Sequence, residues 1–264
     1  MIKPMLAKNF IDFQHRLIFP MALQPKLNGI RMVVEKGKPY SRSGKPLELP
    51  SGLIKDLREY KDLILDGELY VHGIDLEKIY GNAKRLVAKT QDIELEFRGF
   101  DICSNQPFQT RNVKLIERLH DTAHIKLVPT HIVKSVKEIE DWLVFYYQQE
   151  KYEGVMLRSL DAPYMQTRTS ALLKYKPWKF ARAGIILCIE GEGKYVGMLG
   201  AFQVRALEQS GNWTCNVGTG FDDAQRLHFW HNRKKLLCRT INLKYLELTG
   251  LGNPRSPVFI NIEE

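Results

Sequence analysis

Residues 24–31 read Gln-Pro-Lys-Leu-Asn-Gly-Ile-Arg, which places a lysine, a glycine and an arginine at fixed offsets among apolar residues. A lysine amine becomes a nucleophile only when it is unprotonated, and glycine lets a backbone approach a ligand closely. The forked guanidinium of Arg31 can hold oxygen acceptors. Taken alone, Lys26 is more often an ordinary surface lysine, so the segment needs support from the rest of the chain.

Four short segments follow in order, each with a polar or aromatic side chain beside a β-rich stretch: Asp66-Gly67-Glu68, Gly99-Phe100-Asp101, Glu153 to Arg158, and Leu172 to Lys176. The spacing predicts Asp66 at a strand end, and the two lysines of the last segment on one face of a strand. Each segment also has an ordinary interpretation as solvated carboxylate, core aromatic or exposed strand edge. Five such segments in this order favour a shared functional site more strongly than any one of them does alone.

In that order the segments resemble the motifs of the covalent nucleotidyltransferases, and within them the minimal ATP-dependent DNA ligases of phages and large algal viruses. Residues Lys26 to Arg31 are similar to the nucleophile motif Lys-x-Asp-Gly-x-Arg. The resemblance runs from Pro4 to Phe259, and Val217 to Asp222 is similar to the barrel domain of the viral ligases. It therefore favours a ligase over other members of the superfamily.

The resemblance implies that Lys26 attacks the α-phosphorus of ATP, giving a lysyl-adenylate and pyrophosphate. Arg31 and Glu68 would hold the ribose hydroxyls, and Phe100 would stack on adenine. Lys174 and Lys176 would neutralise charge on the α-phosphate in the transition state. The residues assigned to the nucleotide in this way are Gln24, Arg31, Glu68, Phe100, Lys174, Lys176 and Arg255.

The resemblance also implies a metal ion and a DNA substrate. Glu153 would bind Mg²⁺, or Mn²⁺ in its place, and Asp66 would assist the metal or the later sealing step. Arg42 matches the position that grips the 5′-phosphate at a nick, and Arg158 and Arg168 are further candidates for phosphate contact. We therefore expect a monomer that acts on nicked duplex DNA.

Three departures from the family pattern bear on activity. Asn28 stands where the family usually has aspartate, and the second basic position of the last motif falls at Glu263, leaving Arg255 to orient pyrophosphate. Larger viral ligases carry a DNA-wrapping insertion where residues 190–200 form only a short glycine-rich turn, and we expect no separate DNA-binding domain before the catalytic one. Binding should then depend on surface phosphate contacts and weaken steeply with salt.

Composition agrees with a polyanionic partner without identifying it. The chain has 264 residues, with 39 Lys and Arg against 30 Asp and Glu, a formal charge of +9. Ten basic and eight acidic residues follow from Ala181 onward, so most of the excess lies in the first two thirds. Many basic proteins bind nothing in particular, so charge alone leaves nucleic acid binding open.

Other broad classes are excluded or disfavoured. Hydrophobic residues form 44% of the chain, which excludes a disordered or low-complexity protein. We expect neither a membrane span nor a signal peptide, because no apolar run is long enough. The four cysteines include no Cys-x-x-Cys pair, which disfavours zinc and disulfides and predicts an intracellular location, either the cytoplasm or a host cell interior.

Periodicity predicts an α+β protein of two domains. Residues 1–180 would form a nucleotidyltransferase (adenylation) domain of mixed antiparallel sheets and helices, with amphipathic helices at 114–124 and 136–147. Residues 181–264 would form a small OB-fold β-barrel, with five strands and a helical insert near 222–235. The alternative is that these last strands extend one larger sheet.

Two other functions remain open from the sequence. An RNA ligase or an mRNA-capping guanylyltransferase would use the same motifs, and labelled ATP and GTP would separate them. A non-catalytic nucleic-acid-binding module would use Lys26 only as a phosphate contact. A mass shift of one AMP on the intact protein would exclude that module.

Overall fold

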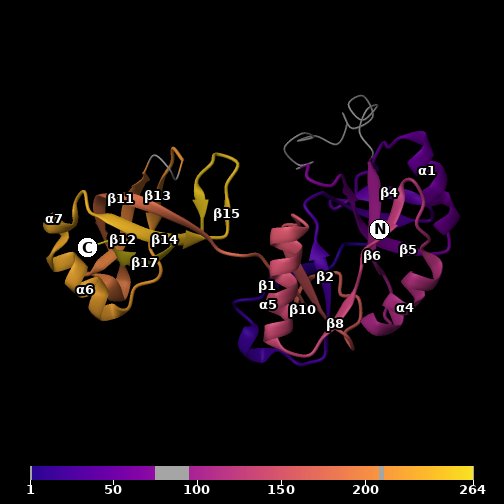
Figure 1. Ribbon diagram of the computed structural model, residues 1–264, viewed down its shortest axis with the longest axis horizontal. Coiled ribbons are helices and arrows are strands. Elements are labelled where there is room, and N and C mark those ends of the chain that lie inside the picture. Colours follow the sequence, from indigo (N-terminus) through magenta and orange to yellow (C-terminus); the bar gives the residue numbers. More distant parts are fainter. Residues whose placement is uncertain (1, 75–94, 208–210, 264) are drawn as a thin grey trace. The chain divides into compact units, whose positions relative to one another are not determined.

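The chain forms two compact units, Met1–Lys176 and Pro177–Glu264, in a computed structural model that describes residues 2–74, 95–207 and 211–263 (Figure 1). The sequence prediction set the boundary between residues 180 and 181. The first strand of the second unit already begins at Lys179, two residues after Pro177. Among the described residues, no helix has the length and apolar character needed to cross a bilayer.

The first unit contains two five-stranded sheets of mainly antiparallel strands. Sheet A has the order β1 (Leu6–Asn9), β10 (Arg168–Tyr175), β9 (Gly154–Ser159), β2 (Met21–Lys26) and β8 (His131–Val133). Sheet B has the order β4 (Lys38–Ser41), β3 (Ile30–Glu35), β5 (Ile64–Tyr70), β6 (Glu96–Ile102) and β7 (Ile125–Leu127). The chain passes from sheet A to sheet B between β2 and β3, which is where the Lys26 to Arg31 segment lies.

Each sheet is covered by helices (Figure 1). Helix α5 (Val136–Val144), which continues as a π-helix to Gln149, packs Ile139 and Leu143 against the core of sheet A. It begins where the periodicity predicts, because the Ser135 side chain accepts a hydrogen bond from the Glu138 N–H and caps the helix. Helices α1 (Ser51–Leu57) and α4 (Phe108–Arg118) belong to sheet B.

Helix α4 differs from the predicted helix at 114–124. It begins at Phe108, after Pro107, whose fixed φ suits the residue before a first turn. It ends at Arg118 because Leu119 is already extended, with φ −92° and ψ 107°. The apolar spacing of Leu115 and Leu119 therefore reflects burial in one core, not one continuous helix.

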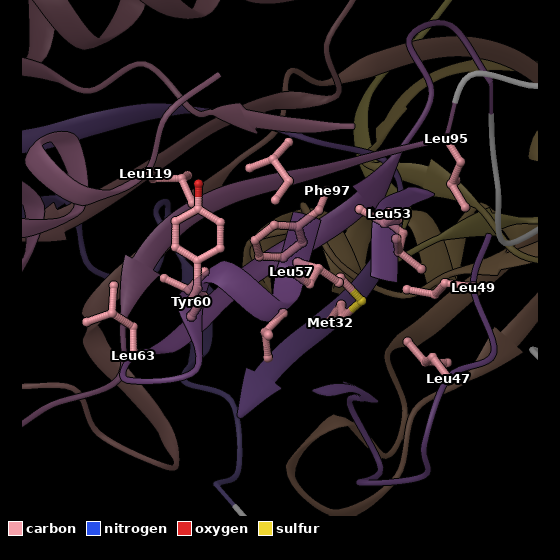
Figure 2. Close-up of a cluster of buried hydrophobic side chains, with 14 of the residues drawn as sticks. Met32, Leu47, Leu49, Leu53, Leu57, Tyr60, Leu63, Leu95, Phe97 and Leu119 are labelled. Atoms are coloured by element: carbon pink, nitrogen blue, oxygen red, sulfur yellow. The ribbon is translucent and has the colours of Figure 1, made fainter. Parts of the chain in front are cut away.

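The core of sheet B explains why these strands and α1 fold together. Met32 and Phe97 point from the sheet toward Leu53 and Leu57 of the helix, and Tyr60 and Leu63 close the end of the cluster (Figure 2). All are at most 7% exposed. This packing fixes the sheet that carries Arg31, Glu68 and Phe100.

The second unit is a small OB-like domain. Its sheet has the order β13 (Thr214–Val217), β12 (Leu199–Ala206), β11 (Lys179–Glu190), β14 (Thr240–Tyr245) and β17 (Val258–Ile262). The two edge strands meet only through a parallel bridge between Thr219 and Val258, so the described residues do not form the closed barrel that the sequence predicted. The helical insert is divided into α6 (Asp223–His231) and α7 (Arg233–Leu236). A hairpin of β15 (Glu247–Leu248) and β16 (Pro254–Arg255) precedes β17.

Candidate active site

Lys26 is the last residue of β2 and lies directly opposite Gly154 of β9. Its ammonium group pairs with one carboxylate oxygen of Glu153, and the ammonium of Lys176 pairs with the other. Lys176 follows the end of β10, so only Lys174 of the predicted lysine pair lies within the strand. One carboxylate thus holds two lysines, and the three side chains are 12% to 24% exposed.

Two glycines allow this close approach. A Cβ on Gly29 would lie 2.1 Å from the Leu69 carbonyl oxygen, so the chain can enter β3 beside β5 only with glycine at this position. Gly154 has a φ of +150°, and a Cβ there would lie 2.2 Å from the Tyr175 carbonyl oxygen. Gly29 of the nucleophile segment therefore allows the close approach of β3 and β5. Asn28 beside it is exposed.

Arg31 and Asp66 form a charge pair in sheet B. The Arg31 Nε and Nη2 donate to the two Asp66 oxygens at 2.6 and 2.5 Å, and the Tyr164 hydroxyl donates to Asp66 at 2.6 Å. Burial opposes the charge on Arg31, but the Asp66 carboxylate outweighs it and raises the pKa of Arg31. Asp66 is fully buried. It lies within β5 and not at a strand end, and its full burial beside Arg31 and Tyr164, unlike the partly exposed Glu153, does not fit the predicted metal or sealing role.

Glu68 faces the same region two residues along β5. It accepts a hydrogen bond from the Gly29 N–H at 3.0 Å and lies opposite Arg31 in the strand register. Burial raises the pKa of Glu68, and the charges of Lys26 and Arg31 oppose this shift. Glu68 is therefore a carboxylate near both the nucleophile and Arg31, in a position compatible with the predicted ribose contact.

Phe100 is 7% exposed, and its ring lies near two guanidinium groups. The Arg31 guanidinium carbon is 4.6 Å from the ring centroid, and that of Arg158 is 5.4 Å from it. Phe100 packs in a small cluster with Leu27 and Tyr70. The ring thus lies close to the segment that carries the nucleophile.

Arg158 and Gln24 lie in the interior, with exposures of 3% and 1%. Arg158 donates to Asp101 at 2.8 Å and to the side-chain oxygen Oε1 of Gln24 at 2.8 Å. The Gln24 amide nitrogen donates to the Phe100 carbonyl at 3.0 Å and to the Thr130 hydroxyl at 2.9 Å. The predicted DNA contact of Arg158 and nucleotide contact of Gln24 do not fit this burial, because their polar groups already have protein partners.

Of the remaining predicted residues, Arg42, Arg168 and Arg255 are exposed and Glu263 is half-buried. Arg42 lies in the turn after β4, and Arg168, at the start of β10, donates to the Ala7 carbonyl at 2.5 Å. In the second unit Arg255 pairs with Glu247 at 2.7 Å, and Glu263 pairs with Arg182. The connection from β11 to β12 contains only one short 3₁₀ turn (Gly193–Tyr195), as expected from its length.

Three residues of the buried network were not predicted: Tyr164, Arg111 and Asp101. Asp101 follows Phe100 directly in the third motif, so its position was a signal that the prediction did not use. Arg111 and Tyr164 belong to no motif that the prediction used, and the partner of Tyr164, Asp66, lies 98 residues away along the chain.

Metal binding is compatible with Glu153 alone. Within the described ranges, no three His, Cys, Asp or Glu side chains come together as a metal site. Mg²⁺ is often held by one or two carboxylates together with substrate phosphates, and the partly exposed carboxylate of Glu153 can supply such a ligand.

Two family models match the chain, one for each unit. The "ATP dependent DNA ligase domain" matches residues 4–176, and the "DNA ligase OB-like domain" matches residues 190–262. The DNA ligase of Haemophilus influenzae is 26% identical over 88% of this chain and 83% of its own length. The DNA ligase of African swine fever virus (strain Badajoz 1971 Vero-adapted) is 31% identical over 97% of this chain, which spans only 60% of that relative.

A solved structure from a "Structure-function analysis of Lig E DNA ligases" has a similar fold. Its TM-score is 0.67, with 23% identity, and the match covers the whole of both chains. The likeness extends over both units of the chain.

Proposed function

This chain belongs to the family of ATP-dependent DNA ligases, and from that premise we propose that it seals 3′-hydroxyl/5′-phosphate nicks in duplex DNA through an AMP carried on Lys26. The observation that supports this assignment is the contact of Lys26 with Glu153, whose other oxygen holds Lys176. The Glu153 carboxylate fixes the direction of the Lys26 side chain, and Lys176 adds a second cation beside it.

Three steps follow from this premise. The Lys26 Nζ loses a proton and bonds to the α-phosphorus of ATP, and the bond to the pyrophosphate oxygen breaks. The AMP then passes to the DNA 5′-phosphate, which restores the lysine. Finally the 3′-hydroxyl attacks that phosphate, AMP leaves, and the nick is closed.

The other residues divide between nucleotide and DNA. Lys174 and Lys176 neutralise the α-phosphate, and Glu68 with Arg31 holds the ribose, since the Arg31 Nη1 donates to no described residue. Phe100 offers its ring to adenine. These roles are proposals that rest on the position of each side chain.

Glu153 would hold the divalent cation, Mg²⁺ or Mn²⁺, which when bound neutralises phosphate charge beside Lys26. On the DNA, Arg42 would grip the 5′-phosphate and Arg168 the backbone. We propose that the protein acts as a monomer inside the cell.

Nick sealing with ATP and Mg²⁺ tests the assignment directly. The expected result is a sealed DNA product and a mass increase of one AMP on the intact protein. Lys26→Arg should lose both, because arginine keeps the charge but stays protonated, while nick binding should persist. Normal AMP labelling of Lys26→Arg would exclude Lys26 as the nucleophile, and labelling by GTP in place of ATP would indicate a capping enzyme.

A further inference from the structure

The proposed site divides the nucleotide between the two sheets of the first unit. Lys26 and Glu153 lie at or beside strands of sheet A, whereas Glu68 and Phe100 lie on sheet B. The adenine that stacks on sheet B and the α-phosphorus that is attacked from sheet A are parts of the same ATP molecule. The spacing of the sheets therefore decides whether the phosphorus reaches Lys26, and a displacement of about 1 Å can cost about 100-fold in rate.

Two buried links cross between the sheets close to these residues. The Arg158 Nη1 on β9 donates to Asp101 on β6 at 2.8 Å. The Gln24 amide on β2 donates to the Phe100 carbonyl on β6 at 3.0 Å. Arg158 joins the two links, because its Nε donates to the Gln24 oxygen at 2.8 Å. Gln24 is two residues before Lys26, so this network connects the strand of the nucleophile to the strand of the stacking ring.

Asp101 does not need Arg158 to balance its charge. The Arg111 guanidinium already binds both Asp101 oxygens, at 2.8 and 3.1 Å, and Arg31 pairs with Asp66 in the same way. Arg158 is thus a third guanidinium beside two buried carboxylates, and like Arg111 it is itself buried. Its particular contribution is geometric, because a single planar fork reaches Gln24 and Asp101 together.

We propose that Arg158 is a positioning residue that, through Gln24, fixes the spacing between Lys26 and Phe100 during self-adenylylation. The inference rests on the proposed function of Lys26. It replaces the DNA contact expected for Arg158 from the sequence with a contact inside the protein.

The test compares Arg158→Met, Arg158→Lys and Gln24→Met with wild type in single-turnover self-adenylylation over a range of ATP concentrations. The matched control is Arg118→Met, which removes an exposed arginine that pairs with Asp62. Loss of a hydrogen bond to a charged group changes an equilibrium or rate constant by about one to two powers of ten. The rate constant at saturating ATP should therefore fall roughly 10- to 100-fold in all three variants. The half-saturating ATP concentration should change by less than about threefold, because the groups that bind ATP remain.

The three variants separate geometry from charge and from folding. A near-normal rate for Arg158→Lys would mean that charge alone is required and would overturn the proposal. Gln24→Met keeps every arginine–carboxylate pair, so it tests the link even if Arg158→Met unfolds, and a normal rate there would also overturn it. Each rate is divided by the fraction of protein that can form the adenylate, measured by titration. A loss of folded protein therefore does not lower the reported rate.

DNA binding distinguishes the inference from its rival. In a Lys26→Ala background, Arg158→Met should leave the salt dependence of nick binding unchanged, whereas loss of a phosphate contact would reduce the slope by about one. A reduced slope would restore the DNA role and overturn the proposal. If wild type itself forms no adenylate, the proposed function fails, and that outcome is distinct from normal variants of an active wild type.

Discussion

Asp66→Asn removes the only carboxylate that the structure pairs with Arg31 among the described residues. The pair has two hydrogen bonds of 2.6 and 2.5 Å, Asp66 is fully buried, and Arg31 is 20% exposed. Removing one partner of a buried ion pair costs about 3 to 5 kcal/mol because the other charge stays buried. For a unit of this size, 1 kcal/mol lowers Tm by about 2 to 4 °C, so we expect a loss of roughly 6 to 20 °C.

Calorimetry and urea titration of the first unit's transition would measure this loss. Asp62→Asn is the matched control, because Asp62 pairs with Arg118 at 2.7 Å on the surface and should cost at most about 1 kcal/mol. The same variant tests the metal role predicted from sequence. If Asp66 only positions Arg31, the Mg²⁺ concentration that gives half-maximal adenylylation should not change. A cost for Asp66→Asn no larger than that of the control, or a large shift in Mg²⁺ requirement, would refute the reasoning.

Three further outcomes are expected. Burial raises the pKa of Glu68, so the native state keeps this proton to higher pH than the unfolded state, and the free energy of unfolding falls as pH rises through that window. Glu68→Gln should remove this fall in denaturation curves measured from pH 4 upward. A pH dependence unchanged from wild type would contradict this expectation. Arg42→Ala should spare adenylylation but slow sealing by about one to two decades, since a charge-assisted phosphate contact contributes about 1.5 to 3 kcal/mol, and equal losses in both steps would place Arg42 elsewhere. Without a long insertion between β11 and β12, six to ten phosphate contacts imply that nick affinity falls roughly 10³- to 10⁵-fold from 50 to 200 mM salt, and binding that resists salt would exclude this mode.

The strands were the most predictable part of the fold. Strands β5 (Ile64–Tyr70) and β17 (Val258–Ile262) coincide with short apolar runs of the sequence, and such runs bounded by turn residues have few alternatives. That the described strands of the second unit do not close into the predicted barrel was not predictable, since the meeting of edge strands depends on curvature that alternation does not encode. The shift of helix α4 has a local cause in Pro107, which a purely periodic argument ignores.

The site divides in the same way between local and distant signals. Lys26, Glu153 and Lys176 were predicted from motif order, and the structure brings them together. Arg158 was not predictable as a buried residue, because its partner Asp101 lies 57 residues away and belongs to another sheet. An arginine in a motif can bind either a carboxylate inside the protein or a phosphate of the substrate, and the burial of its guanidinium distinguishes the two roles.

Two of the departures from the family pattern, Asn28 and Glu263, have different physical meanings. Asn28 is exposed, so the loss of the family's aspartate removes no packing and no buried charge, and the demand for close approach falls on Gly29 instead. Glu263 is different, because Arg182 donates to both of its oxygens at 2.6 and 2.5 Å. A basic residue at position 263 would repel the Arg182 guanidinium. The acidic residue at 263 and the basic residue at 182 therefore depend on each other. The positive charge that the last motif lacks at position 263 is therefore present on Arg182 of β11, on the far side of β14 in the sheet, with the two signs exchanged.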